Sequence, residues 1–140
     1  MKRATRKIEE FLVSQRVEFD PIELADAKEV EKRWLHAFAQ NVKKETGSWI
    51  FNKFKWHGFR CKYESALEGK NALRRYHEQW PAPYYLFDEG GNWCYQCQSD
   101  KYTDFTGLRD DIYVAHHNLK WTMVFTHEQA HDGPYFTMRT

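Results

Sequence analysis

The hydrophobic pattern of the chain changes its period at two prolines, Pro81 and Pro83. Before them, apolar residues recur every three or four positions, as in amphipathic helices. After them, apolar and polar residues alternate, as in half-buried strands. Helices followed by strands with short turns are typical of an α+β domain. The sequence therefore predicts N-terminal helices packed on one face of a mostly antiparallel sheet of about four to six strands, in two layers.

Capping residues indicate where the longest helix begins and ends. Asp20 is a good N-cap, Pro21 suits the first helical position, and Gly47 is a typical terminator. The aromatic segment after Gly47 predicts a strand, because β-propensity is high there. The expected helices cover residues 5–16, 22–45 and 69–79, and the strand lies within residues 48–63.

Two hairpins and a last strand are expected after Pro83. The segments that alternate are residues 84–87 with 92–98, around a DEGG turn, and residues 111–116 with 119–126, around His117-Asn118. A final short strand at residues 134–138 would lie at the sheet edge. Such an edge could pair with a second copy of the chain, so a homodimer is one possible assembly.

Length and composition indicate one globular domain over residues 1–140. No segment reaches the roughly 20 apolar residues that cross a bilayer, and the basic N-terminus lacks an apolar signal core. Three cysteines are an odd number and too few for a disulfide scaffold. These features predict a cytoplasmic protein with no membrane partner.

Charge is unevenly distributed along the chain. Residues 1–80 carry 17 Lys and Arg against 12 Asp and Glu, whereas residues 81–140 carry 4 against 8. The basic and aromatic stretch at residues 53–75 is one candidate for contacts with phosphates and bases, and hence for a nucleic-acid-binding module. The near-neutral total charge and the need for aromatic core residues weigh against nucleic acid as the partner.

The sequence HEQAH at residues 127–131 matches the H-E-x-x-H pattern of zinc hydrolases. On a helix, His127 and His131 would lie one turn apart and could hold zinc, with Glu128 as the general base. Here, however, the segment follows directly on a predicted strand, and Gly133-Pro134 closes it soon after. No third ligand has motif spacing, so the prediction is no cofactor, with zinc as an alternative.

Cys94 and Cys97 form a C-x-x-C pair without a second pair to complete a four-sulfur zinc site. Alternation along the predicted strand places them on opposite faces of the sheet. They are expected to be ordinary structural cysteines.

Several short motifs in the second half resemble a bacterial family known as domain of unknown function 4275. The similarity covers roughly residues 30–136 and rests on Trp56-His57-x-Phe59, E-G-x-x-A at residues 68–72, Asp111-Ile112-Tyr113-Val114, Trp121-Thr122, Thr126-His127-Glu128 and Gly133-Pro134-Tyr135-Phe136. The resemblance implies a small cytoplasmic domain with no assigned chemistry. It includes His127 and Glu128 but not His131.

The resemblance places His57, His127 and Glu128 together in family motifs. Two interpretations of these residues stay open. They could form a polar lock between elements of the fold, or a general acid/base set for catalysis.

Two functions of different classes follow. The favoured one is a non-catalytic protein-binding module, which by analogy has the profile of bacterial immunity and antitoxin proteins, with Trp80, Tyr84 and Tyr102 as interface anchors. The alternative is a hydrolase centred on His57, His127 and Glu128, with or without zinc. The binding module predicts that these three side chains form structural contacts within the fold. The hydrolase predicts that they converge in an open pocket.

Overall fold

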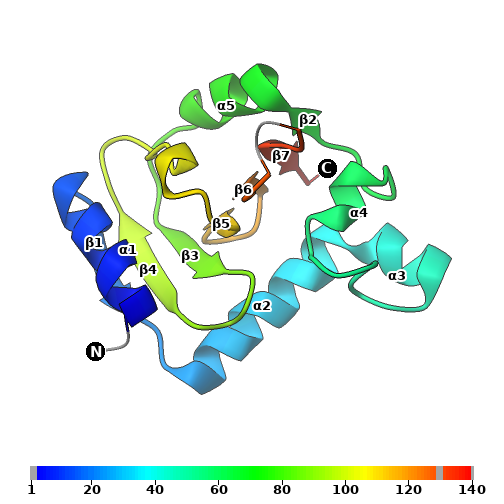
Figure 1. The fold of residues 1–140 in the computed structure, drawn as a ribbon, viewed down its shortest axis with the longest axis horizontal. Coiled ribbons are helices and arrows are strands. Elements are labelled where there is room, and N and C mark those ends of the chain that lie inside the picture. Colours follow the sequence, from blue (N-terminus) through cyan, green and yellow to red (C-terminus); the bar gives the residue numbers. More distant parts are fainter. Residues whose placement is uncertain (1–2, 129–130, 140) are drawn as a thin grey trace.

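One antiparallel sheet of seven strands organises the molecule, with strand order β1-β4-β3-β5-β6-β7-β2 (Figure 1). The computed structural model describes residues 3–128 and 131–139, with side chains from residue 6. The predicted α+β class is confirmed, and the sheet has more strands than the expected four to six. The elements are α1 (Arg3–Ser14), β1 (Glu18–Pro21), α2 (Leu24–Phe38), α3 (Gln40–Thr46), α4 (His57–Arg60), β2 (Leu67–Glu68), α5 (Gly69–His77), β3 (Tyr84–Asp88), β4 (Cys94–Gln98), the 3₁₀ turn η1 (Thr106–Leu108), β5 (Ile112–His116), β6 (Trp121–Phe125) and β7 (Tyr135–Met138).

The additional strands are the two short ones at the ends of the sheet. Asp20 and Pro21, predicted to open a helix, instead end β1 and pair with Gln96 and Tyr95 of β4. Proline is tolerated there because an edge strand has one side without a partner that needs its N–H. At the other end, β2 covers β7 at Tyr135 and Phe136, so β7 is not the outermost strand.

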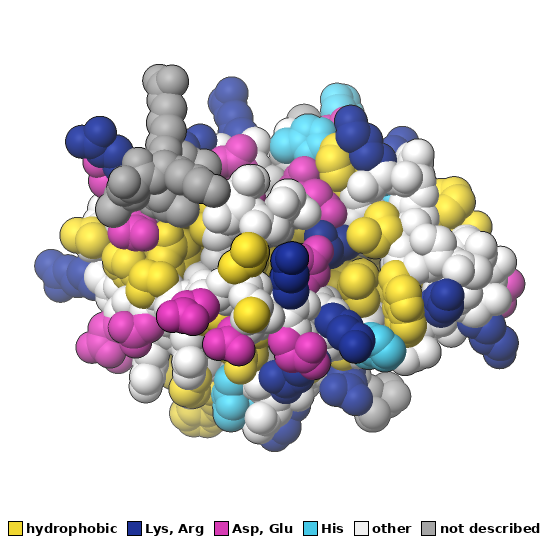
Figure 2. Space-filling model, turned by 90° about the horizontal axis from the view of Figure 1, so that it is seen from below, with side chains coloured by type: hydrophobic (Ala, Val, Ile, Leu, Met, Phe, Trp, Pro, Cys, Tyr) yellow, Lys and Arg dark blue, Asp and Glu magenta, His cyan; other side chains and the backbone are white. Residues whose placement is uncertain are grey.

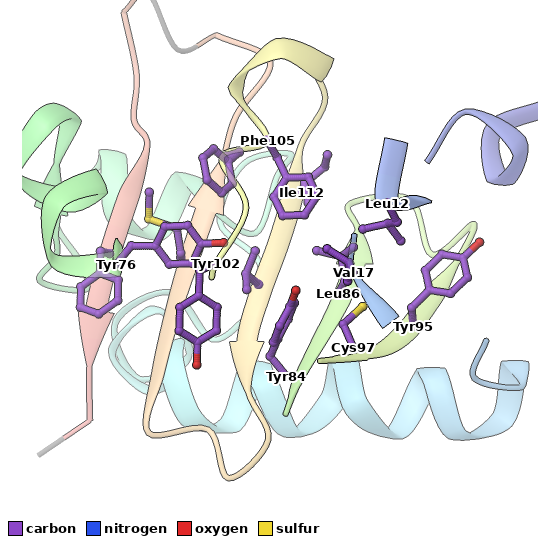
Figure 3. Packing of buried hydrophobic residues seen from close by; sticks show 14 of the residues in the cluster. Leu12, Val17, Tyr76, Tyr84, Leu86, Tyr95, Cys97, Tyr102, Phe105 and Ile112 are labelled. Carbon is purple, nitrogen blue, oxygen red and sulfur yellow. The ribbon is translucent and has the colours of Figure 1, made fainter. Parts of the chain in front are cut away.

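Helices lie on both faces of the sheet, which corrects the expectation of one covered face and two layers. On one face, α1 and α5 pack on the sheet and enclose a first core (Figure 3). On the other face, α2 and the segment around α4 enclose a second core. The first core includes Leu12, Tyr76, Leu86, Tyr95, Val114 and Phe125, and the second includes Trp34, Phe59, Phe87, Tyr113, Val124 and Tyr135.

The central hairpin explains why the second face was not predicted. Every residue of β5 and of β6 is buried, on both faces of the sheet. In such strands the residues on both faces are apolar or have hydrogen-bonded polar groups. The alternation of apolar and polar residues that marks one exposed face is therefore lost. Thr122 is an example: its hydroxyl accepts the indole N–H of Trp34 at 2.9 Å and donates to the carbonyl of Val114 at 2.8 Å.

The long predicted helix is interrupted. Ala39 has φ −129° and ψ 24°, so α2 ends at Phe38 and α3 begins at Gln40. Gly47 terminates α3 in the left-handed region, as predicted. The expected strand within residues 48–63 is wrong, since the described chain there contains only the short helix α4.

The second predicted hairpin is confirmed and sets the position of the candidate site. Its register pairs Ile112 with Phe125. Asp111, just before β5, and Thr126, just after β6, therefore lie opposite each other at the end of the hairpin away from its turn. Leu119, in the turn, has φ 57° and packs in the second core, not with Trp121 in the first as its spacing predicted. Within residues 3–128 and 131–139, no helix has the length and apolar character needed to cross a membrane.

Candidate functional site

The Asp111 carboxylate accepts hydrogen bonds from two separate parts of the chain. One of its oxygens, Oδ1, accepts the Trp56 indole N–H at 3.0 Å, the His127 backbone N–H at 2.9 Å and the His127 Nδ1–H at 2.9 Å. Its second oxygen lies 3.0 Å from the same Nδ1. The side chain is only 10% exposed, so the carboxylate depends on these donors for its stabilisation.

The His127 ring lies between two carboxylates. Its Nδ1 contacts Asp111, and its Nε2 is 3.4 Å from Oε1 of Glu128. The hydrogen bond to Asp111 raises the pKa of His127 above its ordinary value, and the charge of Glu128 adds to this effect. The geometry therefore favours an imidazolium with both nitrogens acting as donors.

His57 lies nearby but bonds elsewhere. It is buried, and its Nδ1 accepts the backbone N–H of Phe54 at 3.2 Å and of Lys53 at 3.3 Å. Burial lowers the pKa of His57, so the ring is neutral. Both histidine rings pack against Phe54 and Trp56, at centroid distances between 4.4 and 5.9 Å. In the described chain, no hydrogen bond joins His57 to His127 or Glu128.

A second polar network lies beside the first. The ammonium group of Lys55, with its side chain 2% exposed, is 2.6 Å from Glu31 of α2 and 3.1 Å from Glu89 after β3. Glu89 also accepts the Lys55 backbone N–H and the Tyr113 hydroxyl. Burial raises the pKa of Tyr113 well above its ordinary value, so its hydroxyl stays protonated and donates. The network joins α2, the β3–β4 turn and β5 to the residue that precedes Trp56.

The HEQAH segment forms a turn where it is described. The backbone N–H groups of His131 and Asp132 both donate to the carbonyl of Glu128, at 2.8 and 2.7 Å. The Thr126 hydroxyl donates to the carbonyl of Asp132, and Asp132 pairs with Arg60 at 3.4 Å. Gln129, which has the spacing to complete a capping box with Thr126, lies outside the described residues. The rigid helix that a zinc site of this type requires is not formed by residues 126–128 and 131–132.

The arrangement supports a structural role better than a catalytic one. A histidine base needs a nitrogen free to accept a proton, whereas both His127 nitrogens contact carboxylates. Over the described residues, no Ser, Thr or Cys side chain is hydrogen-bonded to His57 or His127, and no group of three or more His, Cys, Asp and Glu side chains has metal-binding geometry. The three predicted residues share one neighbourhood without forming one reactive set.

The predicted interface residues divide between surface and core. Trp80 is 89% exposed, as a surface anchor must be. Tyr84 and Tyr102 are 0% and 5% exposed, so their prediction as surface anchors is wrong. Both face the first core because Tyr84 belongs to the inward alternation of β3, and Tyr102 packs on Tyr76, Tyr84 and Trp121.

Cys94 and Cys97 lie in different cores, on opposite faces of β4, as the alternation predicted. Burial raises the pKa of each thiol to about 12. Neither is a reactive thiolate at neutral pH.

Comparison with known proteins identifies the family. The model of a domain of unknown function (DUF4275) matches residues 8–136. The chain belongs to this family. The match confirms the resemblance and extends it toward the N-terminus, beyond the expected start near residue 30. No curated protein and no solved structure matches the chain.

The DUF4275 motifs that carried the resemblance meet around Asp111. The Trp56 indole and His127 donate to its carboxylate, and the ring of Tyr135 stacks on Trp56 at 6.3 Å. The E-G-x-x-A segment joins the same region, because Gly69 donates its N–H to the carbonyl of Pro134 at 3.0 Å. Five motifs, spread over residues 56–136, therefore form one packed and hydrogen-bonded unit.

Sequence reasoning underestimated Asp111 and missed the Lys55 network. The hairpin around His117-Asn118 could have located the first, since its register places residue 111 opposite residue 126. No comparable signal points to Lys55, because its partners come from segments that only the tertiary fold brings together.

Replacing Lys55 tests the second network. Lys55→Met is expected to lower the free energy of unfolding by about 2–4 kcal/mol, because it leaves the carboxylates of Glu31 and Glu89 without their shared cation. The matched control is Lys53→Met, two residues away and exposed, with an expected change within about 0.5 kcal/mol. Urea denaturation of both variants measures the difference. Equal stability of the two variants would show that the network contributes nothing.

The pKa of His127 predicts the pH dependence of stability. Because the folded pKa is raised, protonated His127 stabilises the fold fully below the unfolded pKa near 6.5 and loses this effect as pH rises through the folded pKa. The stability gap between wild type and His127→Gln should therefore be largest in acid and shrink in alkali. High salt should reduce the gap, since the ring is 37% exposed.

The control for this titration is His131→Gln. In the described structure the His131 side chain makes no contact comparable with those of His127, so its stability curve should run parallel to that of wild type. A gap for His127→Gln that grows with rising pH would contradict the assigned charge state. Denaturation curves recorded at a series of pH values on either side of the ordinary histidine pKa of about 6.5 measure the stability of both variants.

Proposed function

We propose that this DUF4275 protein is a non-catalytic module that binds another protein through the surface around Trp80. The observation that carries the proposal is the 89% exposure of this large aromatic side chain. Tryptophan is among the residues most enriched at energetic centres of protein interfaces. Burying such a ring on association removes a large apolar surface from water.

The backbone that presents Trp80 is held by the core. The buried Tyr102 hydroxyl donates to the Trp80 carbonyl at 2.8 Å and accepts the Ala82 N–H at 3.0 Å. Pro81, between these two contacts, restricts the backbone further. An anchor on an ordered backbone loses little conformational entropy on binding. Tyr102 thus holds the backbone of the proposed interface in place.

A concave surface lies beside this anchor. A cavity of about 480 Å³ is lined by Pro81, Tyr102 and residues at the end of α5 and after β4. The combination of a protruding ring and a neighbouring hollow suits a partner that covers one and fills the other.

The hydrolase alternative has less support. The contacts of His127 with Asp111 and Glu128 fit a polar lock that fixes the turn after β6, and His57 uses its Nδ1 within its own turn. By analogy, a small bacterial cytoplasmic protein with this profile would act as an immunity protein or antitoxin does, by holding a protein target. That this chain has such a protein target is part of the proposal.

Trp80→Ala tests the proposal against the matched control Val13→Ala, which removes apolar surface at another site that is 66% exposed. The partner is captured on immobilised wild-type protein from cells that encode it, identified by mass spectrometry and purified. Titration calorimetry should then show that Trp80→Ala weakens binding by about 30-fold or more, as expected for an interface hot spot.

The stability of the free variants completes the test. Both substitutions should change the free energy of unfolding by no more than about 0.5 kcal/mol, because both side chains are exposed. Equal affinity of Trp80→Ala and wild type would contradict the role of Trp80. Failure to recover any stoichiometric protein partner would contradict the proposed function.

A further inference from the structure

A second surface, distant in sequence from Trp80, concentrates positive charge. Residues 43–63 contain six Lys and Arg and one Glu, a balance of +5, whereas the whole chain has a net charge of +1. This segment comprises the end of α3, the loop that follows it and α4. Outside it, the remaining chain is therefore net acidic.

Half of these cations are neutralised by carboxylates and half are not. Lys55 pairs with Glu31 and Glu89, Arg60 with Asp132, and Lys62 with Glu68. The other three, Lys43, Lys44 and Lys53, are exposed and form no ion pair within the described part of the chain. Within residues 43–63, the lysines without an ion pair thus lie at the end of α3 and in the following loop.

The same loop carries apolar rings that the sheet does not cover. Trp49, Phe51 and Phe54 are half-buried in a segment without helix or strand. The Lys43 ammonium lies 5.9 Å from the centre of the Trp49 ring, and the Lys53 ammonium 5.2 Å from that of Phe54. We give the name basic aromatic face to Lys43, Lys44 and Trp49 at and after the end of α3, together with Phe51, Lys53 and Phe54 farther along the same loop.

The charge separation is visible on the molecular surface. In Figure 2, hydrophobic side chains on the α3 side of the molecule lie among Lys, Arg and His, whereas most of the Asp and Glu in this view lie in the middle and on the opposite side, together with some Lys and Arg. The molecule therefore presents a cationic, partly apolar end to a partner.

We infer that the basic aromatic face binds an acidic segment of a protein partner, whose carboxylates meet Lys43, Lys44 and Lys53 and whose apolar groups contact the rings between them. Charge complementarity identifies this occupant, because a surface with uncompensated lysines orients an anionic partner and repels a cationic one. The inference rests on the proposed protein-binding function but uses a surface other than that of Trp80.

The ring contacts favour a protein over single-stranded nucleic acid. Base stacking needs an open ring face. Here the His36 ring lies 4.3 Å from Trp49, Tyr63 is 5.0 Å from Phe51, and Trp56 stacks on Phe54 at 5.6 Å.

Fluorescence anisotropy with defined probes tests the inference. The probes are a labelled glutamate- and leucine-containing peptide, the same peptide with glutamine for glutamate, and a labelled oligo-dT strand. The protein variants are Lys43→Glu/Lys53→Glu and the control Lys28→Glu/Lys70→Glu, which changes net charge equally at two exposed lysines outside both proposed surfaces. Untagged full-length protein is used throughout, with Trp80→Ala as an additional variant.

The acidic peptide should bind wild type, the control pair and Trp80→Ala alike, and bind about tenfold more weakly to Lys43→Glu/Lys53→Glu, with affinity that falls as salt rises. The glutamine peptide and oligo-dT should bind at least tenfold more weakly than the acidic peptide. No binding of the acidic peptide, or equal binding by both double variants, would overturn the inference. Tighter binding of oligo-dT would assign the surface to nucleic acid instead. None of these results bears on capture of a partner through Trp80, so the two proposals fail separately.

Discussion

The Asp111 carboxylate is the constraint on which the rest of this region depends. It is nearly buried, and one of its oxygens accepts three N–H groups from Trp56 and His127. A carboxylate removed from water must be compensated by donors, so its position fixes the indole from the segment before α4 and the turn after β6 relative to β5. Tyr135 of β7 packs on the indole thus positioned.

This constraint also limits what the histidines can do. With carboxylates at both nitrogens and a raised pKa, the His127 imidazole suits a cationic cross-link between Asp111 and Glu128. His57, although close, is buried, with its Nδ1 used to close the preceding turn. These contacts suit stabilisation of the fold. Trp80 takes no part in them, and the basic aromatic face borders them at Phe54.

Local sequence patterns predicted the helices, strands and turns that are determined by residues close together in the sequence. Both hairpins, the helix at α5 and the end of α3 at Gly47 follow from turn residues and periodicity, and the structure contains them. Asp20-Pro21 was wrongly predicted to start a helix, because pairing with β4 overrides the capping preference. The second core was missed because strands buried on both faces lose the alternation that marks one buried face.

The candidate site was predictable only in part. The motifs singled out His57, His127 and Glu128 but left open whether they meet in space. In the structure they share one neighbourhood, and their individual partners depend on tertiary contacts that spacing does not specify. Lys55 illustrates the limit: its buried ammonium looks like one more surface charge in a basic stretch until Glu31 and Glu89 are placed around it. Tyr84 and Tyr102 illustrate the reverse case, in which amphipathic residues expected at the surface belong to the core.

The protonation state of the His127 ring tests the central claim most directly. Imidazole nitrogen chemical shifts of untagged, nitrogen-15-labelled protein, recorded through a pH titration with and without equimolar zinc, report both ring nitrogens. The lock predicts that the pKa of His127 is raised above its ordinary value of 6.5, so that both nitrogens carry protons at pH 6.5, and that zinc leaves its signals unchanged. A neutral ring at pH 6.5, or signals of His127 and His131 that shift together on addition of zinc, would contradict it and restore HEQAH as a metal site.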